Sequence, residues 1–380
     1  MIGRRPIRIE GLRLERNEER DRVAAEVNGA TLYFESRDAE LRPTPEAFVS
    51  ALLVPALTRG ADLVLADALD PAFLDGVTQL MQTFRGWWGY RKLVIRSSTT
   101  ARVPATAVAR SNKEKTGTAL CFSGGVDSFF SLLCNEEQID ALVFVHGFDI
   151  DLADTERANT FQSSLLHIAE HASTRPLVLK TNLREHPVYQ GVNWDHAHGG
   201  ALAAVGHLLA NSNRLIIAAS YPSAYPNPSG SRWDLDPLWS STGMQISHHG
   251  EAFWRGEKLR KIAALPIVRE HLRVCWEHRG GGINCSRCEK CVRTMLTLKQ
   301  AGALETFPVF DSAGGLADRV KGLGHISPIL QPVYRAFLET DIDSKTNRAL
   351  LELIAAKAPP PKKLTRAKTI RKRFKNAFAR

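Results

Sequence analysis

The segment that decides the fold reads TALCFSGGVDSFFSLL and spans residues 118–133. Its apolar start at 118–122 predicts a strand, its two glycines predict a tight turn, and 129–133 predicts a helix. Glycines let the backbone turn sharply and approach a ligand closely. The N–H groups of such a turn, together with the dipole of the following helix, favour an anion and above all a phosphate. The candidate phosphate site is therefore the hexapeptide Ser123-Gly124-Gly125-Val126-Asp127-Ser128.

Two side chains of this hexapeptide add chemistry to the turn. Asp127 and Ser128 fall in the first helical turn, at a helix start that we expect to be exposed. There a carboxylate could hold Mg²⁺ and a hydroxyl could hold a phosphate oxygen. The motif differs from the Walker P-loop, because no lysine follows Gly125. The alternative, an ordinary helix cap, is disfavoured by the paired glycines, the preceding strand and the acid–hydroxyl pair.

Strand-like and helical segments alternate through residues 111–300. Short apolar runs at 142–145, 177–179 and 215–219 predict strands, and 153–172 and 199–210 predict helices. This alternation favours an α/β fold with a doubly wound parallel sheet. In such sheets ligands bind beyond the carboxyl ends of the strands, which is where the glycine turn lies.

Residues 1–110 predict an α+β domain of their own. Asn28-Gly29 joins two alternating runs, 22–27 and 30–35, and is a strong signal for a type I′ hairpin. A helix is expected from Thr44 to residue 58, ending at Gly60, and a second helix at 71–86. Residues 61–66 and 92–95 predict short strands, residues 101–117 a linker, and Trp87 and Trp88 packing rather than ligand stacking.

The charge of the chain is concentrated at its end. The net charge is +10 over 380 residues, with 50 Lys and Arg against 40 Asp and Glu. The last segment, 357–380, is rich in Lys and Arg and has no acidic residue, so the rest of the chain is close to neutral. We therefore expect no general nucleic-acid surface on the folded body. A helical segment is expected at 301–358 and a basic, disordered tail at 359–380, which could bind RNA, an anionic membrane or an acidic protein.

The sequence also predicts where the protein works. Its start has no apolar stretch typical of a secretory signal, and no run of 18 apolar residues predicts a transmembrane helix. Few cysteines in a long chain argue against a disulfide scaffold, so a reducing, cytoplasmic location is expected. The sequence leaves a homo-oligomer open, and the N-terminal domain could recruit a protein or RNA partner.

Four of the six cysteines cluster in the segment 275–291. Cys285, Cys288 and Cys291 follow a C-x-x-C-x-x-C spacing, and Cys275 lies ten residues upstream of Cys285. Four soft ligands favour a structural, tetrahedral Zn²⁺ site, with an iron–sulfur cluster as the less favoured alternative. Arg287, Lys290 and Arg293 flank these positions and would offset thiolate charge. The other two cysteines, Cys121 and Cys134, are expected in the core.

Several further side chains are candidates for the same site. Arg255 and Lys258 precede an apolar helix and could reach a phosphate, although solvated surface charge is an equal alternative. His196 and His198 open a predicted helix near a strand end and could contact a substrate, but a capping or surface position is more usual for such histidines.

The hexapeptide resembles the PP-loop of the ATP pyrophosphatase superfamily. Together with the cysteines about 150 residues later, it resembles the 7-cyano-7-deazaguanine synthase (QueC) family over residues from about 117 to 300. The resemblance implies that ATP activates a carboxylate on a 7-deazaguanine as an adenylate, which an amine then attacks. It also implies that the four cysteines hold zinc. Residues 1–110 and the tail are additions to the family pattern.

Two other functions remain open from the sequence. One is sulfur or amide transfer to tRNA by a PP-loop enzyme, although no Cys-x-x-Cys pair is left once the zinc site is filled. The other is a nucleotide-binding interaction module without catalysis. Release of pyrophosphate from ATP, as opposed to nucleotide binding without turnover, separates the enzymes from the module.

Overall fold

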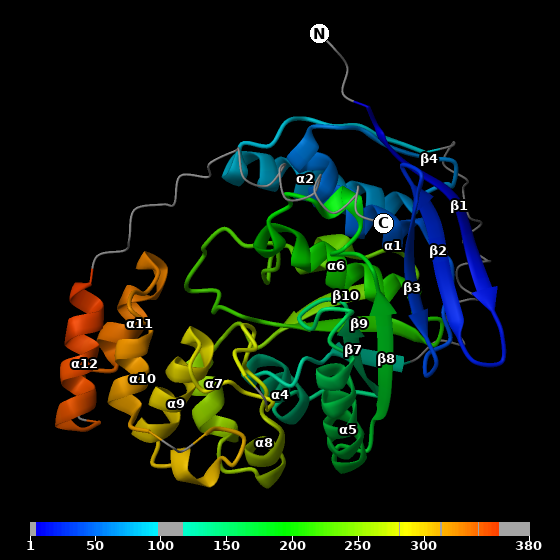
Figure 1. Cartoon of the computed structure of the whole chain (residues 1–380). Coiled ribbons are helices and arrows are strands. Elements are labelled where there is room, and N and C mark those ends of the chain that lie inside the picture. The colour runs from blue at the N-terminus through cyan, green and yellow to red at the C-terminus, as the bar shows by residue number, and fades with distance from the viewer. Residues whose placement is uncertain (1–4, 98–116, 281, 312–313, 341, 357–380) are drawn as a thin grey trace, which may run out of the picture. The chain divides into compact units, whose positions relative to one another are not determined.

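The computed structural model describes residues 5–97, 117–280, 282–311, 314–340 and 342–356 (Figure 1). Contacts divide the chain into two compact units, Met1–Ser312 and Ala313–Arg380. The first unit contains a ten-stranded sheet with the order β10-β9-β6-β7-β8-β3-β2-β1-β4-β5. Its strands are β1 Ile7–Arg16, β2 Asp21–Val27, β3 Ala30–Ser36, β4 Leu63–Leu65, β5 Ile95–Arg96, β6 Gly117–Cys121, β7 Ala141–His146, β8 Arg175–Thr181, β9 Ser212–Ala218 and β10 Gln245–His249.

The helices of the first unit cover both faces of this sheet. They are α1 Pro45–Arg59, α2 Pro71–Trp88, α4 Val126–Leu133, α5 Thr155–His171, α6 Trp194–Leu208, α7 Arg255–Ile262, α8 Pro266–His271 and α9 Glu289–Gln300, with single 3₁₀ turns at Pro187–Tyr189, Asp236–Trp239 and Leu304–Thr306. Figure 1 shows α1, α2 and α6 on one face and α4 and α5 on the other. The α/β prediction is thereby confirmed.

The parallel part of the sheet is formed by β10, β9, β6, β7 and β8. Its strand β7 is buried along its whole length, because helices cover it on both sides. The prediction of a doubly wound parallel sheet holds for this half. It does not hold for β3 and β2, which pair antiparallel with both neighbours. Strand β1 is antiparallel to β2 but parallel to β4, which in turn is parallel to β5.

The N-terminal elements are built into the same sheet. Strand β3 pairs with β8, so the predicted hairpin continues the parallel strands and does not stand apart. The hairpin turn itself is as predicted, since Asn28 and Gly29 both have positive φ, 53° and 81°. The contacts divide the chain near residue 312 and not at residue 110. Helix α1 also packs on α6, where the missing side chain of Gly200 leaves room for the Ser50 carbonyl.

The ends of the N-terminal helices follow their capping residues. Helix α1 runs from Pro45 to Arg59, after Thr44, and ends at Gly60 in the left-handed conformation. Helix α2 starts at the predicted residue but extends two residues further, to Trp88. The strand predicted at 61–66 is shorter in the structure, as β4, and the strand predicted at 92–95 is shorter and shifted toward the C-terminus, as β5.

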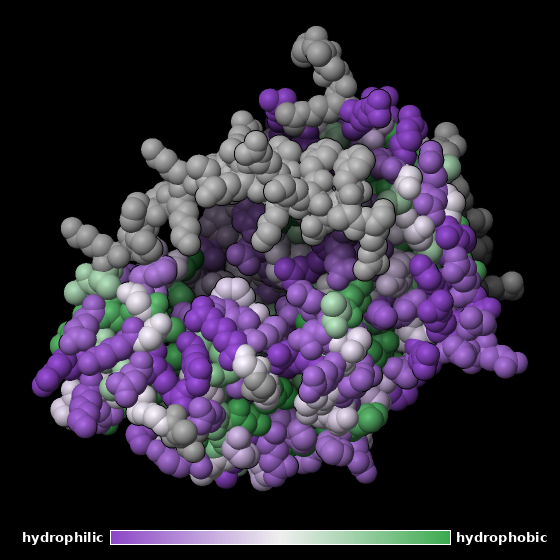
Figure 2. Space-filling model, viewed as in Figure 1, coloured by the Kyte–Doolittle hydropathy of each residue, from purple (hydrophilic) through white to green (hydrophobic). Residues whose placement is uncertain are grey.

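The second unit is helical in its described part, as the sequence predicted for this region. It contains α10 Leu316–Gly322, α11 Gln331–Ala336 and α12 Ser344–Ala355, with a 3₁₀ turn at Pro328–Leu330. The predicted linker up to residue 116 and the basic tail lie outside the described residues. Among those described, no helix combines the length and the apolar character that a membrane crossing needs. On the face seen in Figure 2, the coloured residues are mainly hydrophilic.

Candidate functional site

The glycine turn lies at the carboxyl end of β6, in the middle of the parallel strands. Gly124 has a positive φ of 73°, and Gly125 is the residue before the first turn of α4, which begins at Val126. A side chain on Gly124 would approach the ring of Phe161 to 2.5 Å, so only glycine fits. The hydroxyl of Ser128 donates to the Gly125 carbonyl at 3.1 Å. The predicted strand, turn and helix are confirmed here.

Asp127 is buried and paired, which corrects the expectation that it is exposed. Its carboxylate accepts from the Arg255 guanidinium, and one oxygen lies 3.5 Å from Nζ of Lys258. Lys258 is only 1% exposed and also donates to the Ala219 carbonyl, just after β9, at 2.5 Å. The structure therefore brings together Asp127 and both predicted cations, although they are about 130 positions apart in the sequence.

Helix α7 presents these two cations from its first turn. The Glu257 carboxylate accepts from the Trp254 N–H at 2.7 Å and fixes the helix start, so Arg255 and Lys258 leave the same side of α7. Burial lowers the pKa of Lys258, and the Asp127 carboxylate partly offsets that effect. Burial likewise lowers the pKa of Arg255, against the charge of Asp127.

Helix α9 adds two cations to the same region. Lys290 is exposed and lies close enough to Arg255 for the two charges to act on each other. The charge of Arg293 acts on both Arg255 and Lys290. Its Nε lies 2.9 Å from a carboxylate oxygen of Glu289. The sequence had placed Lys290 and Arg293 only beside the cysteines. The result is an electropositive region that favours a polyanion.

Arg273 was missed from the sequence and supports the turn directly. Its backbone N–H donates to the Gly124 carbonyl and its Nη1 donates to the Ser123 carbonyl, both at 2.8 Å. The residue is 4% exposed, and its guanidinium lies over the Phe161 ring, 5.2 Å from the centroid. Burial lowers its pKa, against the charges of Asp149 and Cys275. No local motif marks an arginine that follows a short helix, so only the fold could identify it.

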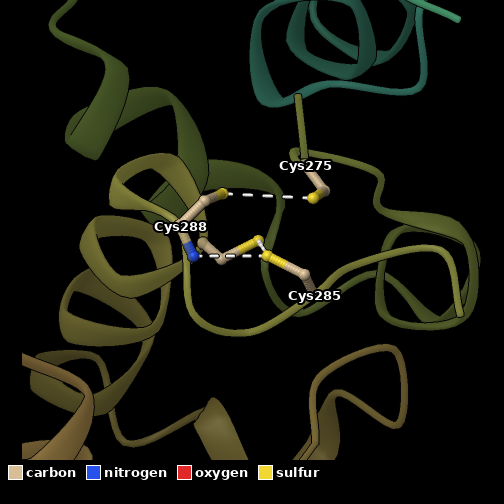
Figure 3. Close-up of side chains that lie close together, drawn as sticks. Cys275, Cys285 and Cys288 are labelled. Atoms are coloured by element: carbon tan, nitrogen blue, oxygen red, sulfur yellow. Dashed lines mark hydrogen bonds between the residues drawn. The ribbon is translucent and has the colours of Figure 1, made fainter. Parts of the chain in front are cut away.

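The four predicted cysteines lie close together, and Figure 3 shows three of them, Cys275, Cys285 and Cys288. Cys275, Cys285, Cys288 and Cys291 are all buried, and their sulfur atoms lie within 4.8 Å of one another. The sulfur pairs Cys285–Cys291 and Cys288–Cys275 are both 4.0 Å apart. A tetrahedron with Zn–S bonds of about 2.3 Å separates its sulfurs by about 3.8 Å, so the cluster fits zinc.

Backbone N–H groups support the cluster, which is typical of thiolate ligands. The Cys288 N–H donates to Cys285 Sγ at 3.2 Å and the His278 N–H donates to Cys275 Sγ at 3.3 Å. The four side chains can therefore hold a metal ion such as zinc.

The other two cysteines differ from each other. Cys121 is buried in β6, and burial raises the pKa of its thiol to about 12, so its predicted core position is confirmed. Cys134 is exposed at the end of α4, so the prediction of a core position is wrong. The helix ends one residue earlier, which turns Cys134 out of the apolar face.

The predicted histidines take part in packing and are not joined to the turn by any described contact. The His196 ring stacks on Trp88 with centroids 3.7 Å apart, and its Nδ1 lies 2.6 Å from the Tyr90 hydroxyl. Nδ1 of His198 lies 3.1 Å from the Asp195 carbonyl. Trp87 lies beneath the guanidinium of Arg232 at 4.7 Å. The packing interpretation of the two tryptophans agrees with these contacts.

An aromatic group next to Arg255 was not predicted as a unit. Tyr221 follows β9, and its ring lies 6.0 Å from Tyr225, which in turn lies 5.5 Å from Trp254. Trp254 is 43% exposed and directly precedes Arg255. The group offers flat apolar area beside the cations.

Comparison with known proteins adds no assignment. The chain matches no protein-family model, and searches of curated proteins and of solved structures gave no match.

Proposed function

We propose that this chain is an ATP-dependent adenylating ligase with chemistry similar to that of the 7-cyano-7-deazaguanine synthases. It activates a carboxylate as an acyl-adenylate, releases pyrophosphate and passes the acyl group to an amine. The resemblance favours a 7-deazaguanine carboxylate as the substrate. The observation that carries the proposal is the convergence of Arg255 and Lys258 on Asp127, in the first turn of the helix that follows the glycine turn.

The charge balance supports a polyanionic ligand. Four cations lie close enough for their charges to interact: Arg255, Lys258, Lys290 and Arg293. The buried carboxylate of Asp127 pairs with Arg255 and Lys258. Asp127 and Glu289 pair with three of these cations, and bound phosphates would add negative charge beside the exposed Lys290. A glycine turn at a helix start adds backbone donors for the same oxygens.

The residues account for both steps of the reaction. In the first step a carboxylate oxygen attacks the α-phosphorus of ATP, the bond from that phosphorus to the bridging oxygen breaks, and pyrophosphate leaves with the electron pair. Arg255, Lys258 and the turn N–H groups stabilise the charge that develops on the leaving group. In the second step the amine nitrogen attacks the acyl carbon, AMP leaves, and the amine proton passes to solvent.

Asp127 and Ser128 are the candidate ligands for a magnesium ion. Mg²⁺ bound to the phosphates supplies charge neutralisation and orients the leaving pyrophosphate. Asp127 would become available to the ion if Arg255 turned from the carboxylate to a phosphate oxygen, which is also an anionic partner for the guanidinium. The aromatic group of Tyr221, Tyr225 and Trp254 supports a planar heterocycle beside these cations.

Zinc at the four cysteines has a structural role in this proposal. All four ligand positions are filled by protein sulfur, which leaves no open coordination position for a substrate. The cluster fixes the start of α9, because Cys288 precedes its first residue and Cys291 lies in its first turn. That helix carries Lys290 and Arg293.

The test is isotope exchange between pyrophosphate and ATP, measured with candidate carboxylates that include 7-carboxy-7-deazaguanine. Exchange reports formation of the acyl-adenylate alone, so the amine need not be known. Arg255→Met should reduce exchange by at least about 100-fold, as expected for the loss of a leaving-group cation. Arg260→Met removes an exposed arginine from the same helix and is the matched control.

The outcomes separate the candidate functions. Exchange that depends on the carboxylate and on Arg255 supports the ligase. Tight ATP binding without exchange, over the full set of carboxylates, contradicts it and favours a nucleotide-binding module. Equal losses in Arg255→Met and Arg260→Met would show that the effect of Arg255 is not specific to the site.

A further inference from the structure

The segment 272–275 lies between the glycine turn and the cysteine cluster and is bonded to both. On one side, Arg273 donates its backbone N–H to the Gly124 carbonyl and its Nη1 to the Ser123 carbonyl, each at 2.8 Å. Two carbonyls of the turn are thus held by one residue. A turn fixed in this way keeps its N–H groups directed at an anion.

On the other side, the same segment is held by Asn284. Its Oδ1 accepts from the N–H groups of Val274 and Cys275 at 2.8 and 3.1 Å, and its Nδ2 donates to the Leu272 carbonyl at 2.7 Å. Asn284 is buried and directly precedes the metal-ligand candidate Cys285. A continuous set of hydrogen bonds therefore runs from the cysteine cluster to the glycine turn.

The positive charge of Arg273 would be balanced in part by a metal–thiolate centre at the four cysteines. Its Nε and Nη2 are buried and have no hydrogen-bond partner within the described part of the chain. The acidic groups whose charges act on this guanidinium are Asp149 and Cys275, which offset part of the cost of its burial. Four thiolates around a dication have a net charge of minus two, and Cys275 is only two positions from Arg273. Metal binding therefore supplies negative charge close to this cation.

We propose that Arg273 is a positioning residue that couples the metal site to the glycine turn, so that metal binding and nucleotide binding strengthen each other. That the ligand at the turn is a nucleotide rests on the proposed function, whereas the hydrogen bonds of Arg273 and Asn284 are observed in the structure. Loss of the metal frees the segment 272–275 on the Asn284 side, and the turn loses the fixed carbonyl contacts that Arg273 provides. Linkage requires that bound nucleotide strengthens metal retention by the same factor.

The experiment uses the full chain loaded with zinc and two measurements. The first is the dissociation constant of ATP for wild type, Arg273→Met and the control Arg287→Met, each at equal zinc content. Arg287 lies between two metal-ligand candidates but is exposed and has no described bond to the turn. We expect Arg273→Met to weaken ATP binding by roughly tenfold or more and Arg287→Met to leave it within about twofold.

The second measurement is the fraction of zinc lost to a competing chelator at equilibrium, with and without saturating ATP. ATP should reduce zinc loss from wild type and from Arg287→Met, but not from Arg273→Met. The wild-type comparison needs no variant, so it stays decisive if Arg273→Met fails to fold. Inorganic pyrophosphate serves as a second probe of the turn.

Each outcome counts for or against the coupling. Zinc loss from wild type that is independent of ATP overturns it, as does ATP binding by Arg273→Met with wild-type affinity. Those results leave the proposed function standing. If zinc-loaded wild type binds neither ATP nor pyrophosphate, both the proposed function and the coupling are wrong.

Discussion

At the scale of single residues, the stability of the site depends on one buried carboxylate. Asp127 is 9% exposed and faces Arg255 and Lys258. Asp127→Asn keeps the shape but removes the charge, so two cations lose their partner, and we expect a loss of about 3 kcal/mol in the free energy of unfolding. Urea denaturation measures this. Glu136→Gln, an exposed change just after α4, should have no effect, and equal stability of both variants would contradict the account.

A second residue predicts how stability depends on pH. His207 in α6 is buried, its Nε2 donates to the Trp239 carbonyl at 2.9 Å, and burial lowers its pKa from 6.5 to about 4. Between these values the unfolded chain binds a proton that the folded chain does not. The neutral His207 therefore contributes about 3 kcal/mol to the free energy of unfolding above pH 6.5, and this contribution is lost as the pH falls toward 4.

Unfolding free energies measured from pH 7 to pH 4 test the role of His207. In His207→Gln the slope in this range should decrease, because the titrating group is gone. His171→Gln removes an exposed histidine and should leave the slope as in wild type. An unchanged slope in His207→Gln would show that other groups control the acid sensitivity.

At the scale of elements, two glycines of the same helix have opposite roles. A side chain on Gly76 of α2 would collide with the Leu238 carbonyl, whereas one on Gly86 would meet nothing within 4 Å. Gly76→Ala should therefore destabilise the protein by about 2 kcal/mol through overpacking. Gly86→Ala should stabilise it by about 0.5 kcal/mol, since alanine favours a helix. Thermal unfolding of the two variants measures both, and destabilisation by Gly86→Ala would contradict the packing described.

Helices and turns that are marked by proline, glycine or an Asn-Gly pair could be predicted from the sequence. Strands that lack an apolar run could not. Pro45 at the start of α1, Gly60 in the left-handed conformation at its end and the Asn28-Gly29 pair mark where α1 and the hairpin begin or end. Strand β10 contains Ser247, His248 and His249, so it lacks the apolar run that reveals a buried strand. Its parallel pairing with β9 is a contact between distant segments, and no local pattern encodes it.

At the scale of the whole molecule, the N-terminal elements share one sheet with the parallel strands that carry the glycine turn. The sequence suggested a separate domain at 1–110, because its hairpin and helices have complete local signals of their own. Pairing of β3 with β8 and packing of α1 on α6 depend on tertiary contacts that such signals do not contain. The same limit applies to the site: the hexapeptide and cysteines are local motifs, whereas Arg273 is recognised only through its contacts.

Deletion of residues 1–97 should therefore abolish folding, and not merely remove an accessory domain. The deletion exposes the edge of β8 and the α1-facing side of α6, both of which are buried in the complete chain. We expect insoluble protein or the absence of a cooperative thermal transition. A soluble, cooperatively unfolding chain of residues 98–380 would show that the N-terminal elements form an independent domain.

The most direct test of the central claim is the identity of the products of ATP cleavage. Phosphorus NMR of the zinc-loaded chain with ATP, Mg²⁺, 7-carboxy-7-deazaguanine and ammonia should show AMP and pyrophosphate in equal amounts. Lys258→Met should abolish both products, whereas Lys261→Met, an exposed change on the same helix, should not. Formation of ADP and orthophosphate, or product formation that is unaffected by Lys258→Met, would contradict adenylation at the glycine turn.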